Sequence, residues 1–98
     1  MTYRNPALLD LARHAPRCFC CGKDNAGTVV AAHSNLQVLG KGMGIKAADI
    51  PAFLCHVCHD LVDGRDSRWD RVKRTDEWYR AAVLSMRWAL ENHPEVFR

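Results

Sequence analysis

The chain has 98 residues, of which 48% are hydrophobic and 26% charged, and its formal net charge is +3. This length predicts one domain with a modest core, which a bound metal would help to stabilise. No apolar run is long enough to cross a membrane, and the first residues lack the pattern of a signal peptide. We therefore expect a cytoplasmic protein with no membrane partner, whose charge is compatible with nucleic acid but does not require it.

The first half of the chain predicts one short helix and one short strand. Asn5 is suited to cap a helix over residues 6–13, because its side chain can accept a hydrogen bond from the first turn. The β-branched and apolar segment 28–33 predicts a strand that ends at His33. A long loop is expected over residues 34–49, and a loop of this length in a small domain is usually functional or disordered.

The second half predicts another strand and two helices. A strand is expected over residues 52–54, and residues 55–63 predict a turn and a short helix that Gly64 ends. Thr75 and the acidic residues after it predict the start of a longer helix, which runs to about Asn92. This helix carries an apolar stripe that we assign to the core: Trp78, Ala82, Val83, Met86, Ala89 and Leu90.

Two matched cysteine pairs are the strongest signal in the sequence. Each pair has two intervening residues, which lets both thiolates reach one ion from a tight turn, and two such turns supply the four tetrahedral ligands of zinc. We therefore predict a structural zinc on Cys18, Cys21, Cys55 and Cys58. Cys20 is a fifth thiol, expected to be a small buried residue or else to replace a neighbouring ligand. The alternatives to zinc are a redox pair or plain core cysteines, but a reducing cytosol and the lack of a βαβ pattern favour zinc.

A second group of residues has chemistry that a structural zinc does not explain. His59 and Asp63 are four residues apart, on one face of the predicted helix, where they could hold a divalent ion that polarises a scissile phosphate. We choose His33 as a base that deprotonates the attacking water. Each residue also has an ordinary alternative: a hydrogen-bonded histidine for His33, a zinc ligand for His59, and a partner of Arg65 for Asp63. Their order around the two cysteine pairs favours an active site.

The order of these motifs resembles the HNH endonuclease superfamily and, more closely, the YbcO-like nucleases of lambda-type phages and prophages. The similarity is carried by residues 27–33, 42–49 and 55–63. It extends over roughly residues 5–92, is specific from 18 to 63, and is loose in the final helix. The resemblance implies an α+β fold: a zinc-stabilised ββα-metal (His-Me finger) core over about 17–66, with flanking N- and C-terminal helices. The whole chain, 1–98, would then be a single nuclease domain, with its C-terminal packing helix over about 75–92.

The resemblance also implies a function and roles for particular residues. It implies a metal-dependent endonuclease that hydrolyses DNA phosphodiester bonds in phage recombination, with Mg²⁺ or another divalent ion as its catalytic metal. His33 would be the general base and His59 a ligand of the divalent ion. Asp49 falls near the central Asn of HNH proteins, which orients the base or the metal loop, and Asp63 falls where the superfamily often has its last His. Ala32 stands where many HNH enzymes have a metal ligand.

Nucleic-acid contacts are expected from Lys41 and Lys46 in the glycine-containing loop and from Arg65 after the short helix. For the charged segment 65–74, a solvated linker is an equal alternative, because acidic residues are interspersed in it. The sequence leaves a homodimer open, and phage or host recombination proteins are further candidate partners.

Two competing functions come from other classes. A non-catalytic zinc-ribbon module that binds DNA or protein explains the four cysteines but gives His33 and His59 no role. A small scaffold could instead bury its tryptophans, Trp69, Trp78 and Trp88, against a partner. A ribbon should hold one zinc, whereas the nuclease should bind a second and weaker divalent ion.

Overall fold

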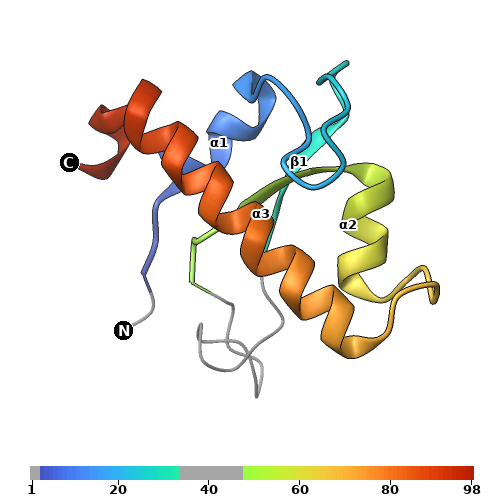
Figure 1. Ribbon diagram of the computed structural model, residues 1–98. Helices are drawn as coiled ribbons and strands as arrows, with labels where there is room; N and C mark the ends of the chain where they lie inside the picture. Colours follow the sequence, from blue (N-terminus) through green and yellow to red (C-terminus); the bar gives the residue numbers. More distant parts are fainter. Residues whose placement is uncertain (1–2, 34–47) are drawn as a thin grey trace.

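Two antiparallel strands, covered by a long helix, form the centre of this small α+β protein (Figure 1). The computed structural model describes residues 3–33 and 48–98. The elements in chain order are α1 (Pro6–Asp10), the 3-10 helix η1 (Leu11–His14), β1 (Val29–Ala32), β2 (Ala52–Cys55), α2 (His56–Asp63), α3 (Arg71–Asn92) and the 3-10 helix η3 (Pro94–Phe97).

Helix α1 begins as the sequence predicts. The side chain of Asn5 accepts a hydrogen bond from the backbone N–H of Leu8 at 3.1 Å, and Pro6 occupies the first turn, where no N–H donor is needed. Leu8 is fully buried and anchors this turn in the core. The predicted helix over 6–13 is therefore confirmed, with its second half wound as the tighter η1.

The register of the sheet decides which residues meet at its two ends. Val29 pairs with Cys55 and Ala32 with Ala52, and all four residues of β2 are buried. Because the strands are antiparallel, the residue that follows β1 lies near the residues that precede β2, whereas Cys55 lies at the opposite end. Both strands were predicted, and their observed ends differ from the predicted ones by at most one residue.

Helix α2 ends where the sequence predicts, whereas helix α3 begins earlier than predicted. Gly64 ends α2 in the left-handed conformation with φ of 85°, as predicted. Helix α3, however, begins at Arg71 rather than at Thr75. The carboxylate of Asp70, five residues before Thr75, accepts a hydrogen bond from the N–H of Lys73 at 2.8 Å and caps the helix. The hydroxyl of Thr75 instead donates to the carbonyl of Arg71 inside the first turn.

Helix α3 crosses the sheet (Figure 1), and its buried face is narrower than we predicted. Its buried residues are Trp78, Ala81, Ala82, Ser85 and Ala89. Ser85 joins helix and sheet, because its hydroxyl accepts from the N–H of Phe53 at 2.9 Å and donates to the carbonyl of Ala81 at 2.7 Å. The assignment of Val83 and Leu90 to the core is wrong: they are 67% and 54% exposed. Each follows a buried alanine by one residue, a turn of about 100° that carries it off the buried face.

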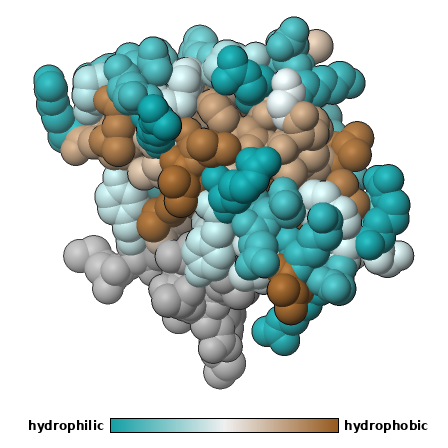
Figure 2. Space-filling view, viewed as in Figure 1, coloured by the Kyte–Doolittle hydropathy of each residue, from teal (hydrophilic) through white to brown (hydrophobic). Residues whose placement is uncertain are grey.

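Part of the surface over α3 is therefore apolar. The exposed large hydrophobic side chains of this helix are Val72, Tyr79, Val83 and Leu90. Figure 2 shows hydrophobic atoms gathered on the face of the molecule that α3 crosses. Among the residues that the structure describes, no helix is both long and apolar enough to cross a membrane.

Candidate metal centre and histidine site

The first cysteine pair lies in a tight turn that points two backbone N–H groups at one sulfur. Cys18 donates its N–H to the carbonyl of Lys23 at 2.8 Å, and Gly22 donates back to the carbonyl of Cys18 at 3.0 Å. Gly22 has φ of 81°, a conformation that glycine adopts without strain. The N–H groups of Cys20 and Cys21 each lie 3.4 Å from the Cys18 sulfur. The turn thus prepares this sulfur to carry negative charge.

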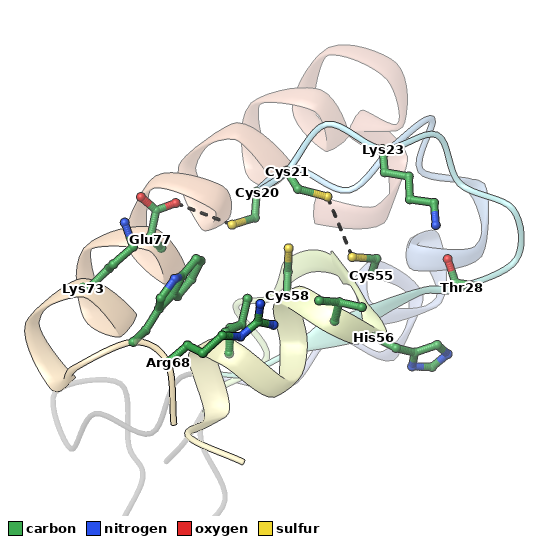
Figure 3. Close-up of a pocket in the computed structure, with 13 residues that line it drawn as sticks. Cys20, Cys21, Lys23, Thr28, Cys55, His56, Cys58, Arg68, Lys73 and Glu77 are labelled. Carbon is green, nitrogen blue, oxygen red and sulfur yellow. Dashed lines mark hydrogen bonds between the residues drawn. The ribbon is translucent and has the colours of Figure 1, made fainter. Parts of the chain in front are cut away.

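The second pair lies where β2 passes into α2. Cys55 ends the strand and occupies the N-cap position of the helix, and Cys58 follows in the first helical turn. Figure 3 shows Cys21, Cys55 and Cys58 turned toward one another. The four sulfurs of Cys18, Cys21, Cys55 and Cys58 lie within 4.8 Å of one another, and those of Cys21 and Cys55 are 3.9 Å apart. Tetrahedral zinc with bonds of about 2.3 Å requires sulfurs about 3.8 Å apart, so the set fits one zinc ion.

The electrostatics of the cluster also favour a bound cation. Burial alone would raise the pKa of Cys18, but backbone N–H groups, those of Cys21 and Cys55 foremost, lower it to about 7. Burial and the neighbouring thiols raise the pKa of Cys58, and burial raises that of Cys21. The thiolate of Cys18 therefore forms readily, whereas Cys21 and Cys58 need a positive ion to lose their protons. Lys23, Arg68 and Lys73 line the cavity beside the cluster and add positive charge around it (Figure 3).

Cys20 lies outside the four-sulfur set. It is half-buried against the core, and its thiol lies 3.5 Å from Oε2 of Glu77 (Figure 3). Burial, reinforced by the Glu77 carboxylate, raises the pKa of Cys20 to about 11. A protonated thiol that donates to a carboxylate is a poor metal ligand, so Cys20 acts as the small packing residue that we expected.

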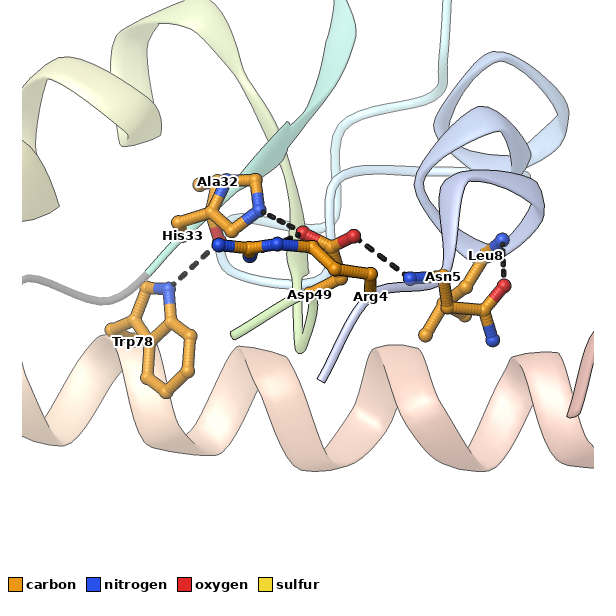
Figure 4. Close-up of polar contacts among 7 residues, drawn as sticks. All are labelled: Arg4, Asn5, Leu8, Ala32, His33, Asp49 and Trp78. Atoms are coloured by element: carbon orange, nitrogen blue, oxygen red, sulfur yellow. Dashed lines mark hydrogen bonds and ion pairs between the residues drawn. The ribbon is translucent and has the colours of Figure 1, made fainter. Parts of the chain in front are cut away.

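His33 and Asp49 meet at the opposite end of the sheet. The Nε2 atom of His33, directly after β1, lies 3.2 Å from Oδ1 of Asp49 (Figure 4). The second carboxylate oxygen of Asp49 accepts the backbone N–H of Asn5 at 2.8 Å, and Nη1 of Arg4 lies 3.5 Å from Oδ1. The indole of Trp78 donates to the carbonyl of Ala32 at 3.0 Å and so fixes the strand end that carries His33.

The environment of Asp49 determines which nitrogen of His33 can act as a base. Burial raises the pKa of Asp49, but the Asn5 N–H, His33 and Arg4 together bring it below the usual value. Asp49 is therefore ionised at neutral pH and only accepts hydrogen bonds. In neutral His33 the hydrogen then resides on Nε2, which leaves the lone pair of Nδ1 available to take a proton.

The predicted divalent-ion ligands lie on α2, and among the residues that the structure describes no third potential ligand joins them. His59 and Asp63 are one helical turn apart and half-buried. Oδ2 of Asp63 lies 3.0 Å from Nε of Arg65, whose Nη1 is also 3.6 Å from Oδ1 of Asp60. Within residues 3–33 and 48–98, the four cysteines are the one set of three or more potential metal ligands that come together.

The predicted nucleic-acid contacts have different outcomes. Arg65 is engaged by carboxylates of α2, whereas Lys41 and Lys46 lie outside the described residues. Arg4, and the contact of Asn5 with Asp49 beyond its helix cap, are not predicted by the sequence, since no local pattern links these residues to position 49.

The tryptophans bear on the scaffold alternative. Trp78 is 5% exposed, and Trp88 packs against Phe53 and Phe19 with ring centroids 5.9 and 6.1 Å apart. The expectation that a partner covers Trp78 is therefore wrong, because the protein's own core covers it.

Comparisons of the chain with protein-family models, curated proteins and solved structures gave no match. The geometry of the four-cysteine cluster and of the His33–Asp49 contact therefore carries the functional proposal.

Proposed function

We propose that the protein is a metal-dependent endonuclease that hydrolyses DNA phosphodiester bonds, with His33 as its general base. The observation that carries this proposal is the contact between His33 and the buried, ionised Asp49 at the end of β1. An imidazole whose far nitrogen is held by a carboxylate has the tautomer and orientation of a base that activates water.

In the proposed reaction His33 takes the proton of the attacking water, and solvent protonates the leaving oxygen. Nδ1 of His33 takes a proton from water as the water oxygen bonds to phosphorus. The phosphorus–oxygen bond to the leaving deoxyribose then breaks, and the leaving oxygen receives a proton from solvent. Asp49 stabilises the imidazolium that forms, because its carboxylate accepts the Nε2 hydrogen throughout.

The divalent ion is the less complete part of the proposal. His59 and Asp63 offer two donor groups on one face of α2, and magnesium commonly takes its other ligands from water and substrate phosphate. Such an ion would stabilise negative charge on the phosphate and leaving oxygen. Arg65 holds the Asp63 carboxylate in the structure, so the ion would have to displace it.

A zinc at the four cysteines has a structural role in this account. Cys55 and Cys58 join β2 to α2, and the turn at Cys18 packs beside both. A zinc there would fix α2, and with it His59, relative to the hairpin that carries His33. The proposed setting is cytoplasmic DNA processing in phage recombination, with DNA as the partner.

A second candidate is a non-catalytic zinc module. It is favoured by one observation, that the four-cysteine set is complete without any histidine. The two functions differ in what His33 does. In a binding module His33 contributes packing or a contact, whereas in the nuclease its removal abolishes cleavage.

Plasmid nicking separates the two candidates. Wild-type protein, His33→Ala and His14→Ala would be compared at equal zinc content with Mg²⁺, Mn²⁺ or Ni²⁺ added. His14 is an exposed histidine of η1 and serves as the matched control. We expect His33→Ala to lose at least about 100-fold in rate and His14→Ala to keep full activity. Equal cleavage by all three would indicate a contaminant, and no cleavage with any metal would favour the binding module.

A further inference from the structure

Arg4 and His33 approach the same oxygen atom of Asp49. Nη1 of Arg4 lies 3.5 Å from Oδ1, and Nε2 of His33 lies 3.2 Å from it (Figure 4). The Asp49 side chain is only 9% exposed, whereas those of Arg4 and His33 are 45% and 37% exposed. A buried carboxylate therefore holds a guanidinium and an imidazole side by side at the surface.

The backbone on both sides of Arg4 is attached to residue 49. The carbonyl of Tyr3 accepts the N–H of Asp49 at 2.9 Å, and the N–H of Asn5 donates to the Asp49 carboxylate at 2.8 Å. Asn5 is fixed further, because its side-chain amide donates to the carbonyl of Val96 at 2.8 Å and its oxygen caps α1. The guanidinium thus extends from a segment held in place at each neighbouring residue.

We propose that Arg4 and His33 flank a phosphate-binding site, in which Arg4 contacts a non-bridging oxygen of the phosphodiester that the His33-activated water attacks. A guanidinium has five N–H donors in a planar fork, so it can contact Asp49 and a phosphate oxygen together. The inference rests on the proposed nuclease function, which it deepens by assigning the group that binds the reacting phosphate.

The charges favour an anion at this position. Arg4 and ionised Asp49 balance one another, and transfer of the water proton to His33 adds a positive charge as negative charge grows on the phosphate oxygens. Arg4 is then a donor whose interaction with the phosphate strengthens in the transition state. A purely structural Arg4 would stabilise Asp49 without affecting phosphate binding.

DNA binding in a cleavage-deficient background tests the site without relying on activity. Fluorescence anisotropy of a labelled DNA duplex would compare His33→Ala with His33→Ala carrying either Arg4→Gln or Arg13→Gln. Arg13 is an exposed arginine of η1 and controls for the lost charge. We expect Arg4→Gln to weaken binding and to reduce the slope of log K against log salt by about 1, with no such change for Arg13→Gln. Equal slopes and affinities, or no binding by any variant, would overturn the site.

Cleavage by the single variants distinguishes failure of the site from failure of the proposed function. Arg4→Gln in the active protein should lower the rate of nicking by about 100-fold, the usual effect of removing one transition-state donor. Unchanged nicking and binding would overturn the Arg4 site while leaving the nuclease intact. Arg4-dependent binding without cleavage in any metal would retain the phosphate site and reject hydrolysis. If Arg4→Gln does not fold, Arg4→Lys tests the site instead. This variant should keep the slope of log K against log salt but nick plasmid more slowly than wild type. Nicking at the wild-type rate would overturn the site.

Discussion

The indole Nε1 of Trp78 donates a hydrogen bond to the carbonyl oxygen of Ala32 at 3.0 Å, although 46 residues separate them. This contact ties the middle of the protein, where α3 crosses the sheet, to the residue immediately before His33. The position of the proposed base therefore depends on a side chain of the C-terminal helix. Substitutions of Trp78 should therefore affect both the stability of the fold and the rate of the reaction that we propose for His33.

Trp78→Phe should lower the free energy of unfolding by about 1 to 3 kcal/mol, because the buried carbonyl of Ala32 loses its donor. Urea denaturation would measure the change. Nicking by the folded variant should also slow, since the strand end that carries His33 is less firmly held. Trp69→Phe, the same exchange at a half-buried site outside the core, is the control. Equal effects of the two substitutions would show that the hydrogen bond is unimportant.

Zinc content should distinguish Cys58 from Cys20. Cys58→Ser removes one of the four sulfurs of the cluster, and we expect it to lose the single bound zinc and its cooperative unfolding transition. Structural zinc contributes on the order of 10 kcal/mol in small domains. Cys20→Ser should retain one zinc per chain, because Cys20 is not in the set. Metal analysis of both purified proteins checks this, and zinc loss in Cys20→Ser would contradict the assignment.

The stabilising effect of Asp49 should depend on pH in a defined direction. Its pKa is lowered in the folded state, so its contribution is present above its unfolded pKa and is lost as the pH falls through the folded value. The difference in unfolding free energy between wild type and Asp49→Asn should therefore not shrink between pH 7 and about 5, and should decline only below about pH 4. Urea titrations at each pH would measure it. A difference that already shrinks between pH 7 and 6 would contradict the ionised, hydrogen-bonded carboxylate.

The substitution Arg65→Gln distinguishes two roles for this arginine, pairing with Asp63 and contact with a DNA phosphate. Because Arg65 is paired with Asp63, its removal should take a competing cation away from this carboxylate and lower the Mg²⁺ concentration that gives half-maximal nicking by several-fold. Arg68→Gln, which breaks the nearby pair with Asp66, should leave the metal requirement unchanged. Weaker DNA binding by Arg65→Gln, with an unaltered metal requirement, would instead favour the phosphate contact expected from the sequence.

Features with a local cause could be predicted from the sequence. The spacing of the cysteines anticipated the four-sulfur cluster, Asn5 marked the start of α1, and Gly64 marked the end of α2. Each depends on the geometry of a few neighbouring residues. The start of α3 was misjudged because two capping residues, Asp70 and Thr75, compete within five positions, and a local pattern does not rank them.

Features that depend on long-range packing could not be predicted. Val83 and Leu90 are apolar at helical spacing, yet each lies one residue beyond a buried alanine and off the face of α3 that packs on the sheet. The contact of Asp49 with the N-terminal segment joins residues 44 positions apart, and only the folded chain brings them together. The resemblance placed Asp49 near the base, but it gave no indication of Arg4.

Chemical rescue of His33→Ala tests the central claim most directly. The purified, zinc-loaded variant would be assayed for plasmid nicking with increasing imidazole at fixed Mg²⁺ and pH, beside His14→Ala. Since the account assigns only proton transfer to the missing ring, added imidazole should restore cleavage in proportion to its concentration and leave His14→Ala unchanged. Wild-type rates in His33→Ala without imidazole would contradict the assignment of His33 as the general base.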